Sequence, residues 1–213
     1  MMRDMVRAGL SAVLAAAVLA GCSSPSGSGT DTGRNGDGAP PKAAGSAAAE
    51  KGSRLGGAGS ACALPVTFDL AADWKPEAVT VEPGSDLAAL GEQGPVTLVC
   101  EIDAKPAGNI GYIRVWQGKP SDTGTRAVLE AFVAGEPNAA KASYTEGKAG
   151  AVAATEVTYT VSGELLDGPK TERAFAVATP GGPVVVHLGG LDSQEHRQML
   201  PAYELAKGSL KLG

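Results

Sequence analysis

The feature that most constrains this 213-residue chain is a 38-residue stretch, positions 23–60, with almost no side chains able to build a core. It contains 10 glycines and 7 serines, and Leu55 is its one large apolar residue. Such a stretch buries too little apolar surface to offset the conformational entropy lost when it is ordered. We therefore expect residues 22–60 to form a disordered tether and residues 61–213 to form the folded domain.

An apolar segment precedes the tether. Arg3 and Arg7 place positive charge near the N-terminus, and residues 10–20 form an uncharged run of 11 residues. That length is typical of the hydrophobic region of a signal peptide. It is too short for the hydrocarbon core of a bilayer, which is roughly 30 Å thick and takes about 20 residues. Residues 1–21 are therefore predicted to be a signal peptide.

The apolar run ends in the sequence Leu-Ala-Gly-Cys, with the cysteine at position 22. This sequence resembles the lipobox of bacterial lipoproteins, in which the cysteine thiol receives a diacylglyceryl group and the signal is cut before the cysteine. The resemblance implies that Cys22 becomes the first residue of a chain anchored by acyl groups such as palmitate at the extracellular face of the cell membrane. Two or three acyl chains anchor stably, whereas one is marginal. An ordinary secretory signal with a chance cysteine is the alternative.

The charge of the predicted domain excludes some partners. Residues 61–213 contain 12 Lys and Arg against 19 Asp and Glu, a net charge of −7. Binding to nucleic acid needs concentrated basic residues to contact phosphates, and docking onto anionic lipid headgroups needs them too. The domain is therefore predicted to bind no nucleic acid and to meet the membrane only through the lipid anchor.

Short β-rich runs separated by Gly, Pro and Asn begin at residue 61. They predict strands near residues 66–70, 78–81, 96–102, 110–116, 142–148, 152–161, 173–179 and 184–188. Helices are predicted over residues 123–134 and after Asp192, where Glu195 forms a capping box and Pro201 should kink or divide the helix. Because most strands follow one another as hairpins, we expect an α+β fold, a mostly antiparallel β-sheet with helices packed on it.

The order of these elements carries a second resemblance. Val66-Thr-Phe68 is soon followed by Ala72-Asp-Trp74, and Pro120-Ser-Asp122 precedes the first helix. With the closing strand–helix unit, residues 61–213 resemble the PsbP-like fold, in particular the LpqN-type actinobacterial lipoproteins. The resemblance implies an α/β/α sandwich and an extracytoplasmic binding or accessory role. It brings no catalytic motif with it.

Two cysteines remain once Cys22 is assigned to the lipid. Export places Cys62 and Cys100 where oxidation is permitted, so we expect a disulfide between them. In the chain-entropy account such a bridge stabilises the fold by about 4 kcal/mol. A redox or metal pair is the alternative, but the two cysteines form no CxxC motif and have no histidine nearby.

The sequence contains no motif of a known catalytic or metal site. The two histidines are His187, expected on the exposed surface of a strand, and His196, in the first turn of the last helix. We therefore predict no catalytic residue, metal or cofactor. A cell-envelope hydrolase using carboxylates such as Glu101, Asp103 or Glu156 is an open alternative, and so is a purely structural envelope protein.

Tyr112 and Trp116 are the one lead to a ligand surface. They lie four residues apart in a predicted strand and so share a face, opposite Ile113 and Val115. If that face points outward, it is an aromatic strip suited to a small apolar ligand or an envelope protein. If helices cover both faces of the sheet, both sets are buried. The sequence as a whole favours a non-enzymatic binding or accessory module.

We expect Cys22→Ala to release the protein from the membrane, because the acyl chains are the predicted anchor. Fractionation of producing cells, with a high-salt wash, measures the release, and mass spectrometry of the native protein should find diacylglyceryl at Cys22. A Cys22→Ala protein that stays in the washed membrane fraction contradicts the prediction.

Overall fold

A computed structural model describes residues 48–81, 84, 88–164, 166 and 168–213. Along these residues the strands and helices follow in the order β1 (Lys51–Leu55), β2 (Val66–Ala71), β3 (Lys75–Ala78), η1 (Ala88–Gly91), β4 (Glu92–Gln93), β5 (Val96–Asp103), η2 (Lys105–Ala107), β6 (Gly111–Gly118), α1 (Thr125–Ala134), β7 (Ala139–Ala149), β8 (Val152–Val161), β9 (Lys170–Val177), β10 (Val184–Gly190), α2 (Ser193–Ser209) and β11 (Lys211–Leu212). Cys22 and residues 1–47 lie outside the described residues.

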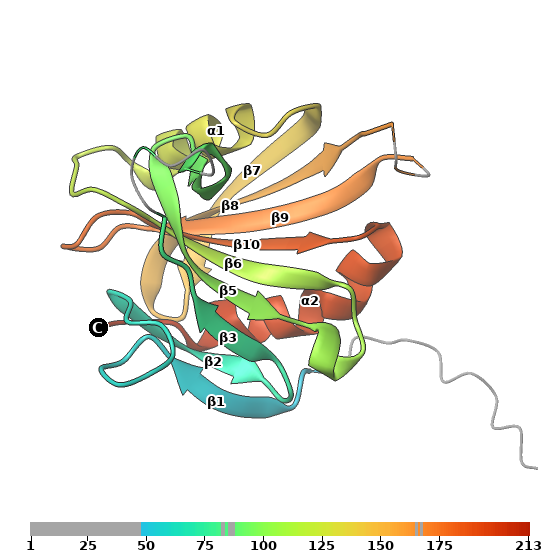
Figure 1. Ribbon diagram of the computed structural model, residues 1–213. Helices are drawn as coiled ribbons and strands as arrows, with labels where there is room; N and C mark the ends of the chain where they lie inside the picture. The colour runs from blue at the N-terminus through green and yellow to red at the C-terminus, as the bar shows by residue number, and fades with distance from the viewer. Residues whose placement is uncertain (1–47, 82–83, 85–87, 165, 167) are drawn as a thin grey trace, which may run out of the picture. The chain divides into compact units, whose positions relative to one another are not determined.

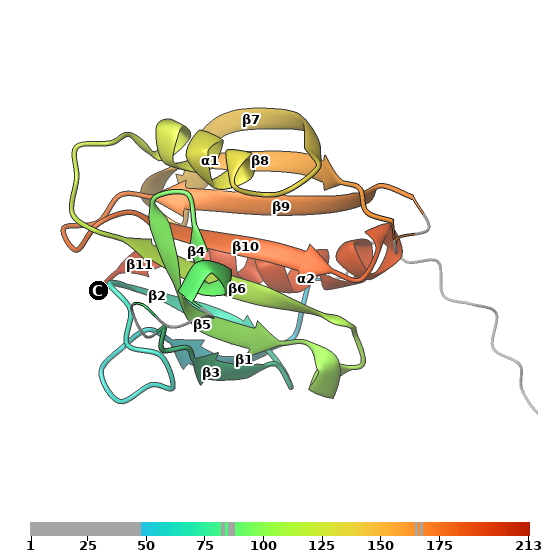
Figure 2. The same ribbon diagram turned by 45° about the horizontal axis from the view of Figure 1, so that its top comes forward.

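Two antiparallel sheets are formed. The larger has eight strands in the order β3-β5-β6-β10-β9-β8-β7, with β4 also paired to β5, and the smaller has the order β1-β2-β11. Figure 1 shows α2 and the small sheet on one face of the large sheet, and Figure 2 shows α1 on the other face, over β8 and β9. The α+β class, with helices packed on a mostly antiparallel sheet, is confirmed.

The two faces of the large sheet have separate cores. Toward α2 and the small sheet, the core contains Phe68, Val186 and Tyr203. Toward α1, it contains Phe132, Trp116 and Val185. Central strand β10 is buried on both faces, which is why its sequence is nearly all apolar rather than alternating.

The prediction of a disordered tether is wrong for its last ten residues, because β1 pairs with β2 there. Leu55 is only 1% exposed. Lys51 and Arg54 of β1 lie 2.9 Å and 3.0 Å from the carboxylate of Asp69, which is itself buried. Gly56 has a φ of +99°, and a Cβ there would lie 1.9 Å from a backbone oxygen of β2. Glycine at this position thus permits close packing, although the composition suggests only flexibility.

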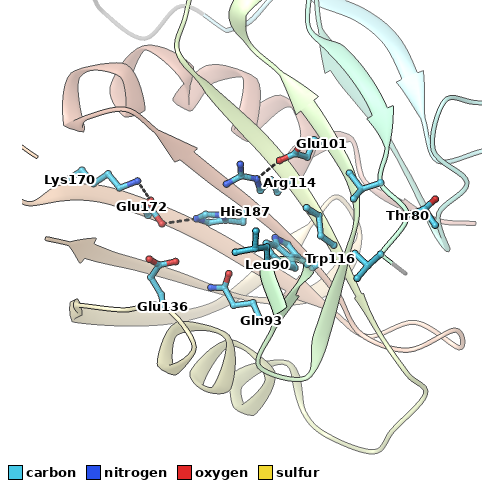
Figure 3. A pocket seen from close by; sticks show the side chains of 14 residues that line it. Thr80, Leu90, Gln93, Glu101, Arg114, Trp116, Glu136, Lys170, Glu172 and His187 are labelled. Atoms are coloured by element: carbon cyan, nitrogen blue, oxygen red, sulfur yellow. Dashed lines mark hydrogen bonds and ion pairs between the residues drawn. The ribbon is translucent and has the colours of Figure 1, made fainter. Parts of the chain in front are cut away.

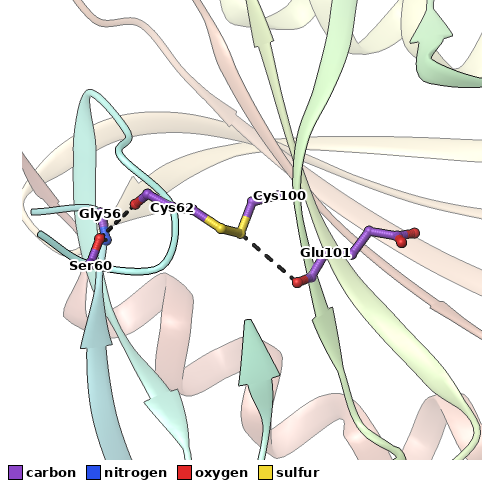
Figure 4. The surroundings of a disulfide bond; sticks show 5 residues. All are labelled: Gly56, Ser60, Cys62, Cys100 and Glu101. Atoms are coloured by element: carbon purple, nitrogen blue, oxygen red, sulfur yellow. Dashed lines mark hydrogen bonds between the residues drawn. A yellow bond between two sulfur atoms is a disulfide. The ribbon is translucent and has the colours of Figure 1, made fainter. Parts of the chain in front are cut away.

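A disulfide joins Cys62 to Cys100, with the two Cα atoms 6.0 Å apart, as predicted (Figure 4). It ties the loop between β1 and β2 to β5. The register of β5 against β6 shifts between Leu98 and Cys100. Such a shift turns the following residues to the opposite face. Cys100 therefore points toward the small sheet and meets Cys62, whereas Leu98 belongs to the core under α1.

Three local predictions are wrong. The strand expected at residues 78–81 is Lys75–Ala78, because pairing with β5 sets its position. Pro201 was expected to kink or divide α2, and the division is wrong, because the helix runs without a break from Ser193 to Ser209. Met199, Ala202, Tyr203 and Ala206 are buried on both sides of Pro201 and hold the helix to the sheet. As predicted, Asp192 caps α2 through the N–H groups of the second and third residues after it. Glu195 does not complete the expected capping box, because its carboxylate accepts the N–H of Ile110 instead.

No helix within the described ranges has the length and hydropathy that crossing a membrane requires.

We expect Leu55→Ala to lower the free energy of unfolding by about 3 kcal/mol, the usual cost of replacing a buried leucine by alanine. Leu212→Ala is the matched control, because Leu212 is 47% exposed in β11 and should cost less than about 1 kcal/mol. Urea unfolding followed by circular dichroism measures both. Equal stabilities of the two variants would show that β1 is not part of the folded unit.

Candidate functional site

A cavity of about 800 Å³ opens on the face of the large sheet that carries α1. Its floor comes from β5, β6, β9 and β10. Its rim comes from the segment after β3, from η1 and β4, and from Glu136, two residues after the end of α1 (Figure 3). The cavity is lined by Val79, Thr80, Val81, Leu90, Gly91, Gln93, Leu98, Glu101, Arg114, Trp116, Glu136, Lys170, Glu172 and His187. Its volume lies within the range of roughly 300–1,000 Å³ that is common for small-molecule sites.

One wall of the cavity is apolar. Trp116 and Leu98 are cross-strand neighbours on β6 and β5 and lie at its base. The edge of the Trp116 ring packs on Phe132 of α1, with the centroids 5.5 Å apart. At the rim, Leu90 of η1 is 75% exposed, the most exposed large apolar side chain within the described ranges. Leu90 thus leaves apolar surface in water beside the apolar wall.

The opposite wall is polar and follows the sheet register. In the register of the sheet, Arg114 of β6 is the cross-strand neighbour of Glu101 on β5 and of His187 on β10. The Arg114 guanidinium donates to the Glu101 carboxylate at 2.6 Å. Both side chains are about one third exposed, so this ion pair faces the opening of the cavity.

Glu172 is the centre of the polar wall and is 3% exposed. Lys170 Nζ lies 2.6 Å from one carboxylate oxygen, and His187 Nε2 lies 2.9 Å from the other, which also accepts a 3.0 Å hydrogen bond from the Tyr159 hydroxyl (Figure 3 shows the first two contacts). Burial opposes ionisation, but the hydrogen bonds and charges of His187 and Lys170 outweigh it and lower the pKa of Glu172 to about 2. Glu172 is therefore ionised at neutral pH, and each of its two carboxylate oxygens has at least one hydrogen-bond or ion-pair partner.

Glu136 differs from Glu172. It follows the end of α1, is half-buried, and its carboxylate makes no hydrogen bond or ion pair within the part of the chain that the structure describes. Burial, with the charge of Glu172 adding to it, raises the pKa of Glu136 above its ordinary value, against the opposing charges of His187, Lys170 and Arg114. Glu136 is thus the carboxylate of the cavity that is left without a cation.

Two cavity-lining side chains have buried ring nitrogens without a hydrogen-bond partner among the described residues, Trp116 Nε1 and His187 Nδ1. Each such group costs about 1–3 kcal/mol, and folded proteins contain few of them.

The structure separates the two predicted ligand residues. Trp116 lines the cavity and is 4% exposed, whereas Tyr112 does not line it and carries the Arg114 guanidinium 5.1 Å above its ring. Ile113 and Val115 are buried on the opposite face. Tyr112 and Trp116 therefore do not form an outward aromatic strip, because Trp116 is buried and only Tyr112 is partly exposed.

The carboxylates considered for hydrolysis are dispersed. Only Glu101 lines the cavity. Asp103 caps η2 by accepting the N–H of Lys105. Glu156 lies on the other face of the sheet, where it accepts from Tyr203 and Lys207. Within the described ranges no group of three His, Cys, Asp or Glu residues could hold a metal ion.

The Glu172 cluster, which is Glu172 with Lys170, His187 and Tyr159, was not predicted from the sequence. His187 was expected on the surface, but it is 4% exposed and shares a face with Val185, two residues away. Lys170 and Glu172 alternate at the start of β9, and Tyr159 is the cross-strand partner of Glu172. From the sequence alone, these polar residues at the start of a strand are expected to face solvent. Only the order of the strands in the sheet brings them beside His187.

Two comparisons with known proteins bear on this chain. The sequence model of a family described as "uncharacterised lipoprotein" matches residues 32–210. A search of curated proteins gave no match.

We expect the Glu172 cluster to make stability depend on acid pH. Because the pKa of Glu172 in the folded state is below its ordinary value of 4.5, its ionised form stabilises the fold above about pH 5, and this contribution is lost as the pH falls toward about 2. The loss should be on the order of 3 kcal/mol. The measurement is urea unfolding of the wild type and Glu172→Gln from pH 5 to pH 2. Since Glu136 titrates in both proteins, the difference between them reports Glu172, and a constant difference over this range would contradict the prediction.

Proposed function

We propose that this chain, which belongs to the lipoprotein family whose model it matches over residues 32–210, is a membrane-anchored binding module that takes an amphipathic small molecule into the cavity. The observation that carries the proposal is the division of the cavity into two walls. Trp116, Leu98 and the exposed Leu90 offer apolar contact on one side, and charged groups stand on the other. A molecule with an apolar body and a polar end matches both walls.

Anchoring at the extracellular face is part of the proposal. Its support is the lipobox resemblance at Cys22 together with the membership in a lipoprotein family. From Cys22 to Ala48, where the described residues begin, the chain has 26 residues, whose fully extended length is at most roughly 90 Å. An anchored cavity at that distance can exchange amphipathic molecules with the outer leaflet or with the adjoining cell-wall space.

The resemblance to PsbP-like and LpqN-type lipoproteins supports a binding or accessory role. The arrangement of the small sheet, α2, the large sheet and α1 agrees with the layered fold that this resemblance implies. A small molecule is favoured over an envelope protein as ligand, because the apolar contact groups line a concave site.

One observation favours an enzyme instead. Glu136 and Glu172 line the same cavity, and their pKa values are moved in opposite directions, as in pairs of carboxylates that act as acid and base. However, three donors occupy the oxygens of Glu172. A carboxylate held in this way is a weak base and a weak nucleophile, because the reaction would have to break its hydrogen bonds and ion pair. Binding is therefore the better-supported function.

The test uses N-phenyl-1-naphthylamine, an uncharged apolar probe whose fluorescence rises in an apolar site. We expect saturable binding to the wild type, and Leu90→Ser should raise the Kd about tenfold, because the probe loses an apolar contact of about 1.4 kcal/mol. Leu212→Ser is the matched control, since Leu212 is also exposed but does not line the cavity. It should leave the Kd unchanged.

Absence of saturable binding, or an equal loss in both variants, would refute the cavity as the binding site. Capture of an envelope protein that does not compete with the probe would point to the alternative of a protein partner.

A further inference from the structure

We infer that the cavity selects ligands with a cationic headgroup, a primary ammonium above all, and that Glu136 is the residue that recognises it. The inference rests on the proposed function, since it names the chemical class of the ligand bound there.

The first argument is the charge balance of the lining. Arg114 is paired with Glu101 at 2.6 Å, and Lys170 with Glu172 at 2.6 Å. The lining holds two basic side chains, Arg114 and Lys170, against three carboxylates, so Glu136 is the carboxylate in excess. An anionic headgroup would add a further negative charge beside the carboxylates of Glu101, Glu136 and Glu172, whereas a cation finds Glu136 without a partner among the described residues.

The second argument is the position of Glu136 at the end of α1. Gly135 caps this helix, and the last turn of α1 has no basic residue to offset the partial negative charge of its terminal carbonyl groups. Gln93, which lines the cavity, donates to one of these carbonyls, Phe132 O, at 3.1 Å. The helix end therefore borders the cavity and adds to the negative potential at Glu136.

The third argument is desolvation. Glu136 is half-buried, and burial is the largest cause of its raised pKa, followed by the charge of Glu172. A carboxylate that is short of water gains more from an arriving cation than an exposed one does. A primary ammonium brings N–H donors and forms charge-assisted hydrogen bonds, which a quaternary ammonium cannot.

The same cavity has an apolar wall in addition to the Glu136 carboxylate. Trp116 and Leu98 lie at the base of the cavity, and Leu90 lies at the rim. An alkyl or aryl body on these residues, with its ammonium on Glu136, would satisfy both walls without opening either ion pair. The ligand class is therefore an amphipathic amine.

The experiment compares octylammonium, octanol and octanoate, which share one chain length and differ in headgroup charge. Each displaces N-phenyl-1-naphthylamine from the full-length protein at pH 7. We expect octylammonium to bind at least tenfold more tightly than octanol, and octanoate to bind most weakly. In Glu136→Gln the preference for octylammonium over octanol should fall below about twofold, while the Kd of octanol stays at its wild-type value.

Glu130→Gln is the matched control. It makes the same change in net charge, but Glu130 is exposed on α1, pairs with Arg126 and does not line the cavity. This variant should keep the tenfold preference. Its loss in Glu130→Gln would overturn the inference by attributing the selectivity to the overall charge of the domain.

Three further outcomes overturn the inference in distinguishable ways. Equal binding of the three compounds to the wild type removes charge selection and leaves the proposed function standing. Preferential binding of octanoate reverses the sign and assigns the headgroup to Arg114 or Lys170. Failure of all three to displace the probe removes the cavity as a site for amphipathic molecules, and the proposed function fails together with the inference.

Discussion

The register shift in β5 is the constraint on which both faces of the large sheet depend. One extra residue between Leu98 and Cys100 reverses the facing of every residue that follows. Leu98 therefore contributes to the α1 side, while Cys100 reaches Cys62 on the other side. The same reversal brings Glu101 to the cavity face, next to Arg114. Without it, and with Leu98 kept in place, Cys100 and Glu101 would both face the wrong side, and the disulfide and the ion pair would both be lost.

The Glu172 cluster has a different kind of importance. An ion pair this deeply buried rarely makes a fold more stable than a well-packed apolar replacement would, although removing one partner costs about 3–5 kcal/mol. Folding stability alone does not account for Lys170, His187 and Tyr159 converging on one carboxylate. The cluster does fix the polar wall of the cavity, since its side chains come from three neighbouring strands and can meet in only one register.

The fold was largely predictable because its signals are local. Alternation in β8, the run of valines in β10 and the capping of α2 by Asp192 can each be recognised within a few residues. The disulfide followed from counting cysteines. β1 was missed because its partners, Asp69 and the backbone of β2, lie far along the sequence, and its glycines resemble those of a linker. Only Trp116 and Glu101 of the candidate site were named from the sequence, because His187 and Glu172 become neighbours only through the order β10-β9.

The location of the cavity follows from how the large sheet is covered. On one face, α2 and the small sheet together pack on the strands. On the other face, α1 has ten residues, a length of about 15 Å, and contacts β7, β8 and β9. Neighbouring strands are about 4.8 Å apart, so a helix of this length lies over about three strands. Beyond them, Phe132 of α1 packs on Trp116 of β6 and on His187 of β10. The segment after β3 and η1 form the rim of the cavity beside these buried side chains, and Leu90 remains exposed there. An amphipathic ligand in the cavity would bury the apolar surface of Leu90, and the polar end of the ligand would contact the charged wall.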